Sequence, residues 1–203
     1  MTHTFYIVRH GNTFNPADVV TRVGGKTDLD LSVAGQDQGR ALAKHFKDTH
    51  FDRCLCSPLN RTRQTAELLL GNRTDAPQIQ FAEFLRELDY GPDENQPESI
   101  VQARIGEEAL HLWETEAVLP QGWVLDIPAL RTAWRNLFDT AKVDGHTLLI
   151  TSNGIARFAL LELGLANKAY TLKLRTGAYG RLERDEIGMT QVKAWNIQPE
   201  PAA

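Results

Sequence analysis

The fold of this chain is decided by its first apolar stretch, Phe5-Tyr6-Ile7-Val8, which continues directly into Arg9-His10-Gly11-Asn12-Thr13. Four consecutive β-favouring residues predict a short buried strand. Gly11 permits a sharp turn where this strand ends, and ligands of open α/β sheets bind at that edge. A guanidinium holds anions with paired hydrogen bonds, and a neutral imidazole can attack phosphorus. Arg9 and His10 therefore suit a phosphorylated ligand. The alternative, from this stretch alone, is a solvated pair at a strand end.

Strands and helices alternate along the rest of the chain. Apolar runs predict further strands at residues 51–56, 78–81, 147–151, 179–184 and 190–195, and apolar spacing predicts helices at about 32–46, 60–70, 99–113, 128–141 and 155–163. This alternation is typical of a three-layer α/β/α sandwich with a mostly parallel central sheet. We expect a single domain over residues 1–203, with a helical insertion at about 92–143 that covers the edge of the pocket.

The composition of the chain limits the classes of partner that we expect it to bind. Its 203 residues are 42% hydrophobic and 24% charged, with a formal net charge of −4. Without an overall basic field, we expect neither nucleic acid nor an anionic membrane surface as a partner. No apolar run approaches the roughly 20 residues that span a bilayer, and residues 1–4 do not resemble a signal peptide. The sequence thus predicts a cytoplasmic protein and leaves its oligomeric state open.

The two cysteines, Cys54 and Cys56, point to the same face of the predicted second strand. Neither a Cys-x-x-Cys nor a His-x-x-x-His pair is present in the sequence, so the spacing expected of a metal site is missing. We therefore interpret both cysteines as small apolar core residues and predict no metal site.

Two later stretches carry residues of chemical interest. Arg61 and Arg63 lie at the start of the helix after the second predicted strand, where a solvated helix face is the simplest interpretation of either. Glu87 lies in Leu85-Arg86-Glu87-Leu88-Asp89-Tyr90-Gly91, and taken alone it predicts a surface carboxylate. The acidic segment 89–98 contains two prolines and little apolar content, which predicts a surface loop.

Taken together, these stretches resemble the histidine phosphatase superfamily, the group that includes the cofactor-dependent phosphoglycerate mutases. The signature of that family is similar to Arg9-His10-Gly11, and its next block is similar to residues 22–35. Ser57-Pro58-Leu59-Asn60-Arg61-Thr62-Arg63-Gln64-Thr65-Ala66 is close to the third block, and residues 85–91 match the block that holds the proton donor. Each motif is modest alone, but their order and spacing together are specific.

The resemblance implies a role for each matching residue. His10 is the expected nucleophile and accepts the phosphoryl group. Arg9 and Arg61 are expected to bind the phosphate oxygens. Glu87 is expected to protonate the leaving oxygen and then to take a proton from the attacking water. Because arginines supply the positive charge that a phosphate monoester requires, neither a metal nor another cofactor is expected.

The last block of the family departs from the pattern in this chain. Counting back from Arg157 places Ser152 where the family has its second histidine, with Thr151 before it. Ser152 and Asn153 can each donate a hydrogen bond to a phosphate oxygen, but neither is charged. The resemblance therefore predicts a phosphatase acting on a small phosphorylated molecule, and the alternative is a phospho-ligand-binding module with weak or no turnover.

Overall fold

The computed structural model describes residues 2–71, 73–141, 144–164 and 170–200, which contain a six-stranded sheet. Its strands are β1 (Thr2–Arg9), β2 (Arg53–Cys56), β3 (Ile79–Phe81), β4 (His146–Thr151), β5 (Tyr179–Asp185) and β6 (Thr190–Ile197). Their order across the sheet is β3-β2-β4-β1-β5-β6. The four strands from β3 to β1 are parallel, and β5 and β6 add an antiparallel hairpin. The predicted mostly parallel sheet is confirmed.

Strand β1 lies inside the sheet because its side chains are apolar on both faces. Phe5 and Ile7 pack into one hydrophobic cluster, while Tyr6 and Val8 pack into the other. The parallel register with β4 ends on the pair Arg9 and Thr151. The residues that follow β1 and β4 therefore leave the sheet side by side at the same edge.

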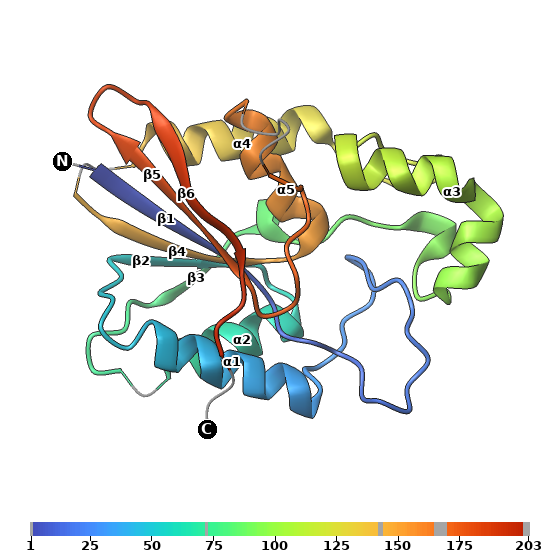
Figure 1. The fold of residues 1–203 in the computed structure, drawn as a ribbon, viewed down its shortest axis with the longest axis horizontal. Coiled ribbons are helices and arrows are strands. Elements are labelled where there is room, and N and C mark those ends of the chain that lie inside the picture. Colours follow the sequence, from blue (N-terminus) through green and yellow to red (C-terminus); the bar gives the residue numbers. More distant parts are fainter. Residues whose placement is uncertain (1, 72, 142–143, 165–169, 201–203) are drawn as a thin grey trace.

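Helices cover both faces of this sheet (Figure 1). One face carries α1 (Val33–His45) and α2 (Asn60–Leu70), and the other carries α4 (Ile127–Asp139) and α5 (Asn153–Glu162). The long α3 (Glu98–Glu116) extends to the right of the sheet in this view. The three-layer sandwich is thereby confirmed, whereas the insertion at about 92–143 stays a prediction.

Both cysteines are fully buried in the cluster beneath α1 and α2, as expected of small core residues. Burial raises the pKa of the Cys54 thiol to about 12, so this thiol stays protonated and unreactive near neutral pH.

Helix α3 departs from the uninterrupted helix that apolar spacing predicted. Gly106 interrupts it with φ 85° and ψ 159°, a conformation that glycine adopts readily because it has no Cβ. The break changes which residues face the core: Val101 and Trp113 are buried on either side of it, while Ile100 is exposed. A single helical period therefore does not describe the whole segment.

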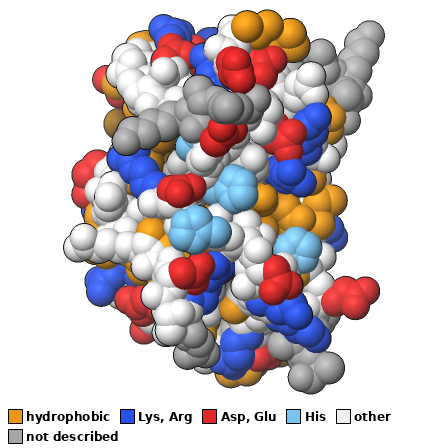
Figure 2. Space-filling view, turned by 90° about the vertical axis from the view of Figure 1, so that its left-hand side faces the viewer, with side chains coloured by type: hydrophobic (Ala, Val, Ile, Leu, Met, Phe, Trp, Pro, Cys, Tyr) orange, Lys and Arg blue, Asp and Glu red, His pale blue; other side chains and the backbone are white. Residues whose placement is uncertain are grey.

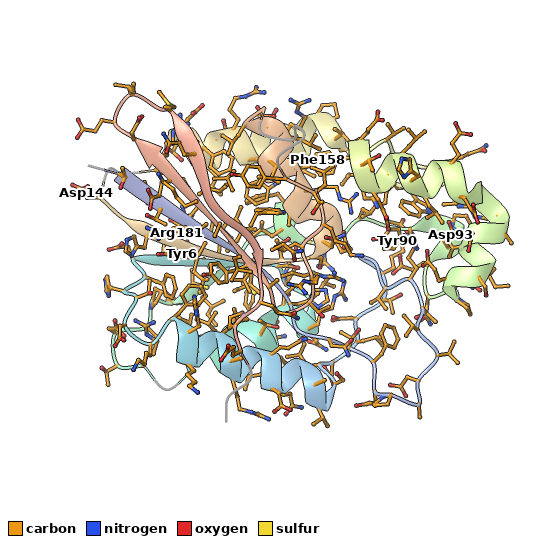
Figure 3. The ribbon with its side chains drawn as sticks, in the orientation of Figure 1. Tyr6, Tyr90, Asp93, Asp144, Phe158 and Arg181 are labelled. Atoms are coloured by element: carbon orange, nitrogen blue, oxygen red, sulfur yellow. The ribbon has the colours of Figure 1, made fainter. Side chains whose placement is uncertain are left out.

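The acidic segment after Glu87 is partly buried, so the surface-loop prediction is wrong there. Tyr90 and Asp93 are 7% and 1% exposed. Asp93 forms an ion pair with Arg104 and accepts a hydrogen bond of 2.6 Å from the indole N–H of Trp123. Figure 3 shows Tyr90 and Asp93 between α3 and the loop that follows β1. A carboxylate can be buried when it is paired in this way, and composition alone does not reveal such a pair.

Candidate active site

His10 follows β1 directly, and its side chain is only 6% exposed. Its Nδ1 lies 2.7 Å from the carbonyl oxygen of Gly11, and its Nε2 lies 3.3 Å from Nε of Arg61. A carbonyl only accepts and a guanidinium only donates, so Nδ1 carries the proton and Nε2 presents its lone pair. These two contacts together define a neutral imidazole with the lone pair that a nucleophile requires.

The surroundings of His10 keep it unprotonated. Burial, and after it the positive charges of Arg61 and Arg9, hold the pKa of His10 well below its usual value of 6.5. The hydrogen bond to Gly11 opposes this shift and is the weaker effect. The imidazole is therefore available as a base or nucleophile at neutral and mildly acidic pH.

Gly11 serves close packing rather than the unusual backbone angle that a sharp turn would need. It is absent from the described glycines with positive φ. A Cβ at this position would lie 2.4 Å from the carbonyl oxygen of Gly35, at the start of α1. The turn after His10 is thus held against α1, and the Gly11 N–H donates to Thr65 of α2 at 3.1 Å.

Arg61 is fully buried in the first turn of α2, while Arg63 is exposed, as the solvated-face interpretation expected for one of them. Besides its bond to His10, Arg61 donates from Nη1 to the Thr27 carbonyl (2.8 Å) and from Nη2 to the Gly24 carbonyl (3.0 Å). These contacts use three of the five guanidinium N–H groups and fix its plane. The two remaining groups are the ones that can reach an anion.

Arg9, the last residue of β1, donates from Nη1 to the carbonyl oxygen of Leu174 at 2.9 Å. Its Nε is buried and has no hydrogen-bond partner among the described residues. Burial lowers the pKa of this guanidinium, and the negative charge of Glu87 opposes the shift. A buried donor without a partner destabilises the empty site, and a bound anion would supply one.

Glu87 is 6% exposed, so the interpretation of this residue alone as a surface carboxylate is wrong. Its carboxylate accepts hydrogen bonds of 3.1 Å from the backbone N–H groups of Leu88 and Gly154. Gly154 permits this approach because a Cβ there would lie 2.2 Å from the carboxylate. Burial raises the pKa of Glu87, as a general acid requires, although both N–H groups and Arg61 oppose the shift.

Ser152 and Asn153, the two residues predicted to donate to phosphate, directly follow β4. Ser152 is fully buried, and within the described part of the chain its Oγ has no hydrogen-bond partner. Asn153 is the first residue of α5, and its Oδ1 accepts from the N–H of Leu174 at 2.8 Å. This bond leaves the amide NH₂ of Asn153 as its available donor group.

A pocket of about 280 Å³ opens at this edge of the sheet, near the lower limit of small-molecule sites. Four of the predicted site residues line it: Arg9, His10, Glu87 and Asn153. Arg61 and Ser152 are fully buried and are not among its lining residues. Arg61 still reaches the site through its bond to His10 Nε2.

Several other residues line the pocket, although the sequence analysis gave them no role. Arg22 and Tyr90 lie inside quoted blocks, and nothing in their spacing distinguished them from structural residues. Thr176 lies beyond the last block, in a segment without strand or helix periodicity. Of the predicted insertion at 92–143, Glu98 lines the pocket.

The residues that the structure describes contain no group of three or more His, Cys, Asp or Glu side chains arranged to hold a metal ion. Among the same residues, no helix has the length and apolar content needed to cross a membrane.

Comparison with known proteins places the chain in a family. The histidine phosphatase superfamily (branch 1) matches residues 5–198. "Probable phosphoglycerate mutase GpmB" of Enterobacter sp. is 30% identical over 89% of this chain and 85% of its own length. "Fructose-2,6-bisphosphatase TIGAR B" of Danio rerio is 36% identical over 99 residues, which are 48% of this chain and 38% of the zebrafish protein. The crystal structure of phosphoglycerate mutase from Bacillus anthracis str. Sterne has a TM-score of 0.79 at 18% identity, over 97% of this chain and 94% of that one.

The chain belongs to the histidine phosphatase superfamily. The similarity to phosphatases and mutases supports an enzyme of the phosphatase type. At 18% identity, the solved structure shows the fold alone.

Proposed function

We propose that the protein is a metal-independent phosphatase that hydrolyses a small phosphorylated molecule through a phosphohistidine on His10. The observation that carries the proposal is the neutral His10, with Nε2 bearing the lone pair in a buried site beside two guanidinium groups. A phosphate monoester carries about −1.5 to −2 charges near neutral pH, so fixed positive charge must be present before a nucleophile can approach it.

The first step transfers the phosphoryl group to His10. Nε2 gives up the hydrogen bond that it accepts from Arg61 and forms the N–P bond, while the P–O bond to the alcohol breaks. Glu87, protonated because burial raises its pKa, gives its proton to the leaving oxygen. Arg9 and Arg61 stabilise the charge on the phosphoryl oxygens, and the NH₂ of Asn153 donates a further hydrogen bond.

The second step releases phosphate. Water attacks phosphorus, its proton passes to the Glu87 carboxylate, and the N–P bond breaks. The electron pair returns to Nε2, which restores the neutral imidazole and the protonated acid. The hydrogen bond from Nδ1 to Gly11 holds the ring in one orientation through both steps.

Ser152 supports a second candidate, a module that binds phosphorylated ligands with little turnover. The loss of a charged contact in a desolvated site costs about 2 to 4 kcal/mol of transition-state stabilisation, or roughly 30- to 1,000-fold in rate. The buried, unpartnered Oγ of Ser152 can donate one neutral hydrogen bond to phosphate. Binding alone, however, gives no role to a buried carboxyl with a raised pKa.

The test is hydrolysis of p-nitrophenyl phosphate in the presence of a chelator, for the parent, His10→Ala, Ser152→His and the control His146→Ala. We expect activity in the parent and in the control, a loss of about a thousandfold or more in His10→Ala, and a gain in Ser152→His. Mass spectrometry of enzyme quenched during turnover should find a phosphoryl group on the His10 peptide.

Each candidate has its own signature in this experiment. Activity that survives in His10→Ala, or that the chelator abolishes, contradicts the proposed mechanism. An inert parent with an active Ser152→His favours the binding module. Because Ser152 is fully buried, circular dichroism must show that the histidine variant folds.

A further inference from the structure

The pocket is lined by two sets of residues: we call the part formed by Arg9 and His10, at the end of β1, its floor, and the part formed by residues 14–23 and Glu98 its mouth. Phe14, Val20 and Val23 bring apolar side chains to the mouth from the loop that joins β1 to α1. The charged residues beside them are Arg22, on the same loop, and Glu98, the first residue of α3. Figure 1 shows this loop in blue, close to the near end of α3.

Arg22 is held in place from several sides. Its guanidinium carbon lies 5.3 Å from the ring centre of Tyr90 and 5.0 Å from that of Trp123. Its terminal nitrogen forms an ion pair with the carboxylate of Glu98. The side chain is only 14% exposed, whereas that of Glu98 is 52% exposed. Arg22 is therefore the fixed partner, and its charge is already neutralised at the mouth.

The backbone fixes the same pairing. The Arg22 N–H donates to the Gln96 carbonyl at 2.9 Å, and the Asn95 N–H donates to the Arg22 carbonyl at 2.8 Å. Thr21 and Pro97 form an isolated antiparallel bridge beside them. These contacts hold the loop directly against the start of α3, so the ion pair is part of a formed wall.

Other cations near this wall are also engaged. Lys26 pairs with Asp89 at 2.7 Å, and Arg104 pairs with the buried Asp93. Glu94 adds a carboxylate that accepts from the backbone N–H groups of Gly24 and Tyr90. Among the described residues that line the pocket, Arg9 is the cation that forms no ion pair. Arg22 is paired with Glu98, although its Nε, like that of Arg9, is buried without a hydrogen-bond partner among the described residues.

We infer that the pocket selects phosphomonoesters whose alcohol portion is uncharged, and that Glu98 determines this specificity by neutralising Arg22. The inference rests on the proposed function and names the substrate class of the same site. A phosphoryl group occupies the cationic floor. A carboxylate or second phosphate at the mouth would have to displace Glu98 from Arg22 or lie beside its charge, and the apolar side chains offer it no compensation.

The test compares glycerol 3-phosphate with 3-phosphoglycerate, which share a phosphorylated carbon skeleton and differ by an alcohol in place of a carboxylate. We expect the parent to favour glycerol 3-phosphate in kcat/KM by roughly five- to tenfold, the size of a partly exposed charge effect. Glu98→Gln frees Arg22 and should shift the ratio toward 3-phosphoglycerate by a similar factor. Arg22→Gln leaves Glu98 unpaired and should shift it the other way.

Glu108→Gln is the matched control, because Glu108 is an exposed carboxylate on the same helix, outside the pocket lining. It should leave the ratio unchanged. The shift in Glu98→Gln should shrink as salt rises, which a merely structural effect would not do. Calorimetry with both compounds on the His10→Ala variant gives the same ratio from binding alone.

These measurements separate the inference from the proposed function. Absence of hydrolysis of p-nitrophenyl phosphate and of both probes removes the phosphatase, while the calorimetric ratio still tests the mouth. A parent that favours 3-phosphoglycerate, or a ratio unaltered by Glu98→Gln, overturns the inference and leaves the phosphatase in place.

Discussion

Histidine and acidic side chains lie at both ends of β1 and β4, but their surroundings differ. At the carboxyl ends, the buried His10 and Glu87 and the half-buried Arg9 line a pocket of about 280 Å³. At the amino ends, His50 is 62% exposed, and it lies 3.1 Å from Asp75 and 3.6 Å from Asp52. Figure 2 views that end and shows histidine side chains beside acidic ones on the surface. A cavity of about 460 Å³ opens there too.

The larger cavity and the visible histidines thus lie at the end without the catalytic arrangement. His50 lies beside exposed carboxylates in solvent, where such pairs interact only weakly. A histidine buried between two guanidinium groups has a lowered pKa, and burial raises the pKa of a carboxyl nearby. Burial of incompletely paired charge, rather than residue type or cavity size, distinguishes the reactive end of the sheet.

Glu87→Gln tests the contrast between the two ends of the sheet most directly, because it removes the acidic proton and keeps the shape of the side chain. We expect kcat/KM for an alkyl phosphate such as glycerol 3-phosphate to fall by about a hundredfold. The fall should be much smaller for p-nitrophenyl phosphate, whose leaving group needs little protonation. The measurement is kcat/KM for both substrates.

Glu83→Gln is the control for this change. Glu83 lies a few residues before Glu87 and is an exposed carboxylate that pairs with Arg86. It should alter neither substrate. An equal loss on both substrates in Glu87→Gln would mean that Glu87 holds the site together without acting as an acid.

The protonation of His10 gives the second contrast. At pH 5.5 an ordinary histidine is about ten-to-one protonated, whereas His10 should remain neutral because its pKa lies well below 6.5. Below about pH 6.5 the unfolded chain takes up a proton at this residue and the folded chain does not. Stability must therefore fall as pH decreases through that range.

NMR titration of the His10 ring and urea unfolding between pH 7.5 and 5.5 measure the two effects. The loss of stability toward low pH should be smaller in His10→Ala than in the parent. A His10 resonance that titrates near 6.5 would show that the site is hydrated and its charges screened.

His50→Ala should have the smallest effect. Its contacts with Asp52 and Asp75 are exposed, so we expect the free energy of unfolding to change by less than about 1 kcal/mol. We expect kcat/KM to stay the same. Urea unfolding and the p-nitrophenyl phosphate assay test both values, and a large loss of activity would connect the two ends of the sheet.

Much of the fold could be predicted because local signals agree with it. The helix over residues 60–70 and the cap at Ser32 are found as predicted, the latter with its Oγ accepting from Gly35 at 3.2 Å. Burial of Tyr90 and Asp93 could not be predicted, since it depends on Arg104 and Trp123 from later parts of the chain. Paired charge has no periodicity in sequence.

Motifs identified the residues of the candidate site, but they did not predict the environment of these residues. The resemblance pointed to His10 and Glu87, but burial, which lowers the pKa of His10 and raises that of Glu87, follows from packing around them. The neutralised Arg22 depends on a contact with Glu98, 76 residues away. A sequence pattern selects residue types, whereas three-dimensional contacts decide their charge.

The position of β1 in the sheet has a consequence for how the protein folds during its synthesis. Arg9 is made early, yet its Nη1 donates to Leu174, 165 residues later, and its N–H donates to Ala178. Its strand pairs with β4 and β5, both late in the chain. Such distant contacts are closed slowly, because the chain must first lose the entropy of long loops. A nascent chain on the ribosome therefore exposes β1 until β4 and β5 emerge, and the anion site assembles only after they have paired with it.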